Sequence, residues 1–164
     1  MRRSSQVDCG ETGRIRDFSG MKNVQTKVVT RRPADEVYAY LADFTHQAEW
    51  RFDVLTSELV SGEVGRVGAR YRQRVRPGRK ETASEVELTR ADPPGEVAFR
   101  TLDRGPVTVS GAWHIRSVDA GTEVVCDVAI ETKGPLKLLE PLMGPQLRKI
   151  AGRYEADLSE RLGA

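Results

Sequence analysis

The end of the chain carries the pattern that most constrains its fold. Apolar residues between Pro135 and Leu162 recur at steps of three and four, the spacing of one face of an α-helix. They are Leu136, Leu139, Met143, Leu147, Ile150, Tyr154, Leu158 and Leu162. Such a helix must lie against an apolar surface, because its stripe would otherwise face water. Gly144-Pro145 interrupts the pattern and predicts a kink or a break there, since Pro145 has no backbone N–H to donate.

The residues before this helix read as a series of half-buried antiparallel strands. We expect a strand over 24–30, a short helix over 33–43, a loop or helical turn over 45–49 and a strand from about 52 to 60. Turn sequences then separate five more strands. The pattern predicts an α+β fold, in which a curved antiparallel sheet of six or seven strands wraps around the long C-terminal helix and leaves a cavity between them.

Two turns fix the predicted register of the later strands. Pro77 and Gly78 suit the centre of a type II turn, which pairs Tyr71 with Ser84 and Gln73 with Thr82 on the inner face. The same register pairs two arginines with two glutamates on the outer face: Arg74 with Glu81 and Arg70 with Glu85.

The last hairpin has Ala120-Gly121 as its expected two-residue loop. That loop pairs Trp113 with Val128 and Ile115 with Cys126. A one-residue change in the preceding loop would exchange Trp113 and His114 between the two faces, and we place Trp113 inside because burying an indole is more favourable.

Four hydrogen-bonding side chains therefore point into the predicted cavity: Tyr71, Gln73, Thr82 and Ser84. If buried, they need partners, which a ligand's oxygen atoms, water or their own cross-strand bonds can supply. Trp50 and Phe52 form either an aromatic lip on the cavity or a plug in the core. The remaining predicted wall residues are Val86, Phe99, Trp113, Cys126, Val128, Met143 and Leu147.

Composition and charge exclude several classes of function. Lys and Arg total 26 against 24 Asp and Glu in 164 residues, so a net charge of +2 gives no field suited to nucleic acid. No apolar run is long enough for a membrane span. Cys9 and Cys126 are poorly placed for a disulfide, which favours a reducing, cytoplasmic location. We expect residues 1–22 to be a flexible extension, residues 23–164 to form one domain, and the chain to be a monomer or homodimer.

The candidates for catalysis are few. Two histidines without metal-ligand spacing give no metal site, and no Gly-x-Ser-x-Gly elbow supports a nucleophile. His46, Glu49, Arg51 and Asp53 cluster near Trp50, where we expect a solvated loop. Tyr71 is the one titratable group expected inside, and is the candidate catalytic acid. No cofactor is predicted.

The front of the chain, VVTRRPADEVYAYLADFTHQAEW, resembles the START-like helix-grip superfamily, and within it the polyketide cyclase/dehydrase and lipid-transport group. The resemblance rests on a strand, Pro33 to Val37, then Leu41-Ala42-Asp43 and Trp50, and it extends from about residue 23 to the C-terminus. It implies a cavity between sheet and helix that holds hydrophobic small molecules.

Three functions remain open at this level. The first is binding or carriage of a hydrophobic, oxygen-bearing molecule, polyketide-like or lipid-like. The second is a polyketide cyclase/dehydratase of the aromatase type acting on such a molecule, because the same fold serves both. The third is a protein-interaction module without a small-molecule ligand.

Overall fold

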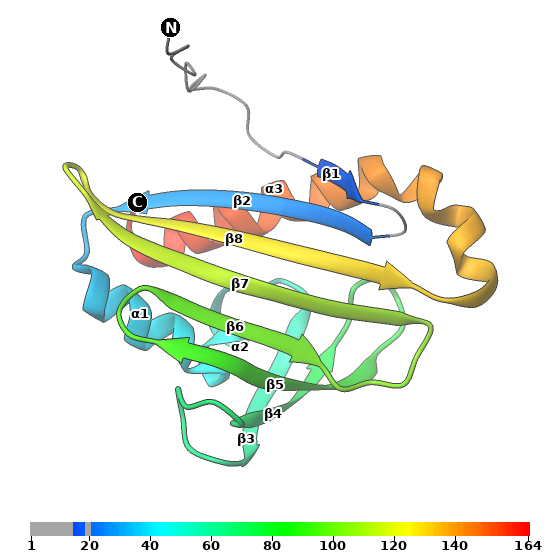
Figure 1. Ribbon diagram of the computed structural model, residues 1–164, viewed down its shortest axis with the longest axis horizontal. Coiled ribbons are helices and arrows are strands. Elements are labelled where there is room, and N and C mark those ends of the chain that lie inside the picture. Colours follow the sequence, from blue (N-terminus) through cyan, green and yellow to red (C-terminus); the bar gives the residue numbers. More distant parts are fainter. Residues whose placement is uncertain (1–14, 19–20) are drawn as a thin grey trace, which may run out of the picture.

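A strongly curved antiparallel sheet wraps around one long helix (Figure 1). The computed structural model describes residues 15–18 and 21–164. Its strands are β1 (Ile15–Phe18), β2 (Met21–Thr30), β3 (Val54–Ser61), β4 (Arg70–Val75), β5 (Thr82–Asp92), β6 (Glu96–Thr101), β7 (Val107–Val118) and β8 (Gly121–Thr132). Its helical segments are α1 (Ala34–Ala42), the 3₁₀ turn η1 (Phe44–His46), α2 (Gln47–Trp50), the 3₁₀ segment η2 (Gly134–Leu139) and α3 (Glu140–Leu162). The predicted α+β helix-grip fold is confirmed.

The described strands follow the order β1-β2-β8-β7-β6-β5-β4-β3. The seven strands from β2 to β8 match the upper end of the prediction, and β1 adds an eighth by pairing antiparallel with the free edge of β2. Strand β1 and the start of β2 fall within the stretch expected to be an extension. Residues 1–14 and 19–20 of that stretch lie outside the described residues.

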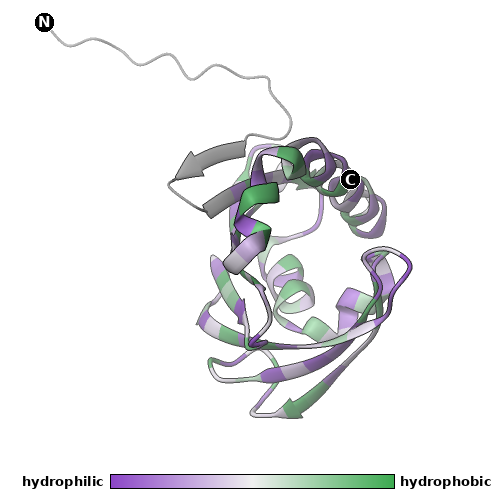
Figure 2. Ribbon diagram, turned by 90° about the vertical axis from the view of Figure 1, so that its right-hand side faces the viewer, coloured by the Kyte–Doolittle hydropathy of each residue, from purple (hydrophilic) through white to green (hydrophobic). Residues whose placement is uncertain are grey.

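Alternation along the strands separates the two faces of the sheet (Figure 2). In β4, Tyr71 and Gln73 are buried, while the arginines on either side of them are exposed. A charged ladder is present on the outer face, and the predicted pair of Arg74 with Glu81 is confirmed. The predicted pair of Arg70 with Glu85 is wrong, because Arg70 contacts Glu87 and Glu85 contacts Arg72. Side chains of one face therefore point to α3, and those of the other face point away from it.

Both predicted hairpin registers are wrong by two residues. Tyr71 pairs with Val86 and Gln73 with Ser84, because the connection between β4 and β5 is longer than a two-residue turn. Trp113 pairs with Cys126, because the last turn is centred on residues 119–120. A shift of two preserves the face on which each side chain lies, so the assignment to faces survives both errors.

A break in the C-terminal helix at Gly144-Pro145, one of the two predicted outcomes, does not occur. Helix α3 continues through Gly144-Pro145. Pro145 lies near the start of the helix, where it removes one backbone hydrogen bond, to the carbonyl of residue 141. Apolar contacts with the sheet stabilise the later turns of the helix. The irregular region lies earlier, where η2 gives way to α3 at Leu139, which is 49% exposed rather than buried.

Two groups of buried apolar residues hold the helix to the sheet. The larger group joins α1, η1 and the last turns of α3 to the inner face, and includes Val37, Phe44, Trp113, Leu158 and Leu162. The smaller joins the middle of α3 to β2 through Val24, Leu147 and Ala151, with Ile130 and Met143 packed against it. The C-terminal half of α3 is therefore the firmly packed half.

Candidate functional site

The inner face of the sheet is fully covered at one end and only partly covered at the other. Near α1, Val97, Trp113 and Val124 are at most 5% exposed. Further along the same strands, Phe99 and Val128 are only partly buried, although they point to the helix side and pack against the main core. Apolar side chains left partly open between a sheet and a helix mark a site for an apolar ligand.

A chain of buried polar side chains lies beside this apolar surface. The Gln73 Nε2 donates to Gln47 Oε1 at 3.0 Å and to Ser57 Oγ at 3.1 Å. Gln73 is 2% exposed and Gln47 is 5% exposed. Strand β4 places Gln73 on the inner face, and α2 places Gln47 against it. The bond pairs the Gln73 amide N–H with the Gln47 carbonyl oxygen, so each buried side chain has a polar partner.

Arg51 connects this chain to an ion pair. Its guanidinium donates to Gln47 Oε1 at 2.9 Å and to both carboxylate oxygens of Asp53, at 3.2 and 2.9 Å. The Tyr154 hydroxyl, from α3, donates to Asp53 at 2.7 Å and accepts from Arg51 at 3.1 Å. The bonds of Tyr154 thus fasten the helix to the junction between α2 and β3.

Burial and charge shift the acidities of this group. Burial raises the pKa of Tyr154 to about 12, against the opposing effect of Arg51. For Arg51, burial by itself would lower the pKa, but the interactions with Tyr154 and Asp53 leave the pKa raised. At neutral pH Arg51 is therefore charged and the Tyr154 phenol is neutral.

Aromatic rings line the boundary between this polar chain and the core. Trp50 and Trp113 pack edge to face with ring centroids 5.9 Å apart, and Trp50 packs likewise against Tyr154 at 6.3 Å. The Trp113 Nε1–H is buried and has no acceptor among the described residues. An unpartnered buried donor costs about 1–3 kcal/mol, which an oxygen atom of a ligand would recover.

Most of the predicted wall residues come together on the inner side of the sheet. Trp50, Val86, Trp113 and Cys126 lie in the main core, with Phe99 and Val128 against it, and Met143 and Leu147 lie in the smaller group on α3. Trp113 is inside and His114 is exposed, as expected. Burial raises the pKa of the Cys126 thiol, so this residue is an inert part of the wall. Phe52 lies outside this set, under the Arg153 guanidinium at 3.9 Å.

The predicted polar quartet does not act as a unit. Gln73 belongs to the buried polar chain, but Thr82 is exposed at the start of β5. Ser84 donates to Asp103 at 2.5 Å. Tyr71 is fully buried and its hydroxyl accepts from the backbone N–H of Gly65, in the loop after β3, at 3.4 Å. Burial raises the pKa of Tyr71, and this loop contact makes it a structural residue rather than an acid facing a ligand.

Sequence reasoning missed the burial of Arg51 and Asp53, which it placed in a solvated loop. Asp53 is 6% exposed. The two residues lie at a turn between α2 and β3, so no strand or helix periodicity in the sequence signalled their burial. Their partner Tyr154 was recognised only as an apolar member of the helix stripe.

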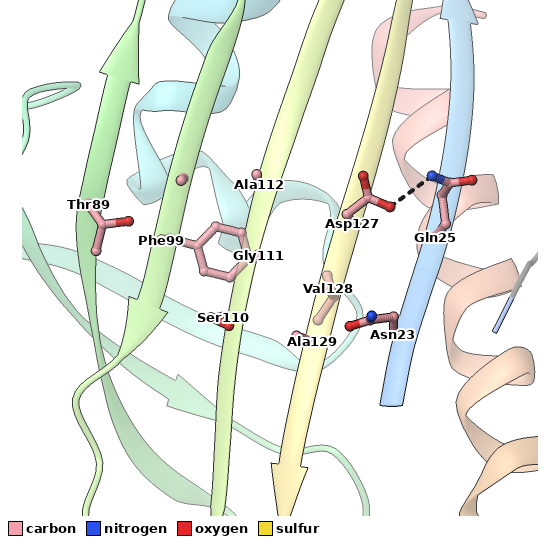
Figure 3. A pocket seen from close by; sticks show the side chains of 11 residues that line it. Asn23, Gln25, Thr89, Phe99, Ser110, Gly111, Ala112, Asp127, Val128 and Ala129 are labelled. Atoms are coloured by element: carbon pink, nitrogen blue, oxygen red, sulfur yellow. Dashed lines mark hydrogen bonds between the residues drawn. The ribbon is translucent and has the colours of Figure 1, made fainter. Parts of the chain in front are cut away.

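Two hollows open at the surface and border some of the predicted wall residues. One, of about 550 Å³, lies over the small residues Ala98, Ser110, Ala112 and Ala129, and Phe99 and Val128 also border it (Figure 3). Its rim includes the hydrogen bond from Gln25 to Asp127, at 2.8 Å. The other, of about 540 Å³, lies between the α2–β3 junction and the last turns of α3 and is lined mainly by charged residues. Of the predicted wall residues, Phe99 and Val128 line the first hollow, and Trp50 and Phe52 line the second.

Solved structures share this architecture. A protein from Thermus thermophilus superposes with a TM-score of 0.68 at 20% identity, covering 87% of this chain and 96% of that one. A START superfamily protein from Mycobacterium smegmatis gives 0.67 at 14% identity, covering 87% and 97%. The Zhui aromatase/cyclase from Streptomyces sp. R1128 gives 0.61 at 22% identity, covering 84% and 96%. The fold therefore defines a protein of the START-like helix-grip class.

The family follows from the sequence. Residues 21–160 match the model of the polyketide cyclase / dehydrase and lipid transport family, and the chain belongs to that family. A search of curated protein sequences gives no match. Across residues 15–18 and 21–164, no helix has both the length and the hydropathy to cross a membrane.

Proposed function

We propose that this protein binds or carries a hydrophobic small molecule with oxygen substituents, held between the inner face of β5–β8 and α3. The observation that carries the proposal is the incomplete covering of the apolar inner face, where Phe99 and Val128 remain partly open. Membership of a family that includes lipid-transport proteins supports it.

The polar groups beside this surface suggest how the ligand is oriented. The Trp113 Nε1–H lacks a protein acceptor within the described residues, and the Gln47–Gln73 amide pair lies on the same side of the sheet. A carbonyl or hydroxyl oxygen suits such groups, while a pure hydrocarbon would leave the indole donor unpaired. The preferred ligand class is therefore an aromatic or alicyclic ketone or phenol, which includes polyketide-like molecules.

A calorimetric titration with two matched probes tests the proposal. We expect 1-naphthol to bind more tightly than naphthalene, which has the same rings without the oxygen. Trp113→Phe should weaken the binding of 1-naphthol by about tenfold, the value of one good hydrogen bond, and leave the affinity for naphthalene unchanged. Equal affinity of the wild type for the two probes would contradict the polar part of the proposal, and no binding of either would contradict the whole.

Polyketide cyclase/dehydratase activity is the second candidate, and the buried Tyr154–Asp53 pair is the observation that favours it. A phenol held by a carboxylate can return a proton to an enolate or a leaving hydroxyl. Tyr154→Phe should then abolish turnover of a polyketide-like substrate while calorimetry still detects its binding. Turnover that survives this substitution would remove Tyr154 from the mechanism.

A further inference from the structure

Three leucines at the start of the C-terminal helical region lie open to solvent. Leu138 is 82% exposed, Leu139 is 49% exposed and Leu142 is 76% exposed. By contrast, Leu147 and Leu158 further along α3 are at most 9% exposed. Three large apolar side chains within five residues form a concentrated exposed patch. Exposing such a patch to water is unfavourable, so patches of this kind mark interaction surfaces.

Basic residues surround these leucines. Lys133 and Lys137 are exposed, and within the described part of the chain neither forms an ion pair. Arg148 and Lys149, two turns further along α3, are likewise exposed and unpaired among these residues. The acid of the segment, Glu140, accepts a hydrogen bond from Thr132 and so points back to the end of β8. Positive charge beside exposed leucine side chains matches the chemistry of an anionic lipid surface.

The patch also lies at the open end of the interior. Segment η2 follows β8 directly, and the Lys133 N–H donates to the Pro106 carbonyl at 2.7 Å, so the patch adjoins the β6–β7 loop. Met143, one residue after Leu142, packs into the smaller apolar group with Ile130. Figure 2 looks at this end of the molecule, and the helical segment that faces the viewer shows hydrophobic (green) bands beside hydrophilic (purple) ones.

We propose that the surface formed by Leu138, Leu139, Leu142, Lys133 and Lys137 docks on anionic membranes. The leucines enter the interfacial layer and the lysines contact lipid phosphates, which places the open end of the interior against the bilayer. A hydrophobic ligand then passes between membrane and protein without crossing water, a consequence that rests on the proposed ligand-binding function.

Vesicle co-sedimentation tests the docking directly. The full chain is mixed with vesicles of phosphatidylcholine alone or of phosphatidylcholine with a quarter phosphatidylglycerol. We expect binding to the anionic vesicles, little binding to the neutral ones, and loss of binding in 0.5 M NaCl. Equal binding to both vesicle types would overturn the electrostatic part of the proposal, and binding to neither would overturn all of it.

Matched variants assign the binding to this surface. Leu138→Ser with Leu142→Ser, and separately Lys133→Gln with Lys137→Gln, should each reduce binding by about tenfold or more. The control Val64→Ser with Val67→Ser removes apolar side chains that are 48% and 62% exposed on the loop after β3, and should bind as the wild type does. Circular dichroism checks that all variants fold. Equal loss in the control and the leucine variant would overturn the proposal.

Two further experiments distinguish membrane docking from dimerisation through the same patch and from failure of the proposed ligand binding. If size-exclusion chromatography with light scattering shows a dimer that the leucine variant converts to monomer, the patch is an interface between copies and the proposal fails. The naphthol titration is run on the same variants. Intact probe affinity without vesicle binding refutes only the docking, and intact vesicle binding without probe affinity refutes only the proposed function.

Discussion

Removing Asp53 tests whether the buried polar group fastens α3 to the sheet. The Asp53 side chain is 8% exposed, and its substitution by alanine would leave the Arg51 guanidinium, 22% exposed, without its carboxylate. Two bonds from Arg51 and one from Tyr154 are lost together. Breaking one partner of a buried ion pair costs about 3–5 kcal/mol. At a urea slope of about 2 kcal/mol per M, the unfolding midpoint should fall by about 2 M.

A double-mutant cycle makes the test specific. Arg51→Met should cost nearly as much as Asp53→Ala, because it leaves the carboxylate buried with only Tyr154 as a partner. Replacing both, with Arg51→Met and Asp53→Leu, should cost about 1–2 kcal/mol, far less than the sum of the single changes. The matched control is the outer pair Arg72 and Glu85, 60% and 39% exposed, whose single changes should cost under about 1 kcal/mol. The reasoning would be refuted if the losses in free energy of unfolding at Arg51 and Asp53 were additive, or were no larger than those at Arg72 and Glu85.

Two further predictions concern packing and pH. Gly111→Ala should lower the free energy of unfolding by about 1–3 kcal/mol, because a Cβ there would lie 2.7 Å from a ring atom of the phenylalanine on β6. Gly152→Ala should raise the free energy of unfolding by about 0.5–1 kcal/mol, because a Cβ there meets nothing within 4 Å and alanine favours the helix. Thermal melts of the two variants check the contrast, and equal shifts would contradict it. The hydrogen bond from Lys27, and to a lesser extent that from Arg116, lowers the pKa of Glu123 below 4.5. The ionised Glu123 therefore stabilises the fold above the pKa of the unfolded chain, and this contribution is lost as the pH falls through the lower pKa of the folded protein. Urea midpoints between pH 3 and 6 should therefore fall less steeply for Glu123→Gln than for the wild type, and identical slopes would remove Glu123 from the acid sensitivity.

Alternation of side chains predicted the inner wall better than it predicted strand pairing. Trp113, Cys126 and Val86 lie on the expected face, although both hairpin registers were two residues out, because a face depends only on odd or even position. Thr82 is the exception, since the longer connection leaves it at the exposed end of β5. Face assignments therefore hold in the middle of a strand and fail at its ends.

The polar part of the site depends on contacts between distant residues. Asp53 is buried because Tyr154, 101 positions later, completes its hydrogen bonds. A local pattern gives no information on such a pairing, so a charged pair beside a tryptophan reads as a solvated loop. The helix stripe failed at Leu139, which lies exposed at the junction of η2 and α3.

The measurement that most directly tests the central claim, an apolar ligand held inside the sheet, compares two adjacent positions on β8. Both residues border the hollow over β6–β8, but Val128 also packs against the buried core, whereas Ala129 points to the opposite face of β8. Val128→Trp should fill the open end and reduce 1-naphthol affinity by at least about tenfold in calorimetry, while Ala129→Trp should leave the affinity unchanged, with circular dichroism confirming that both variants fold. If Ala129→Trp abolishes binding and Val128→Trp does not, the ligand lies on the outer face of β8 and the internal site is wrong.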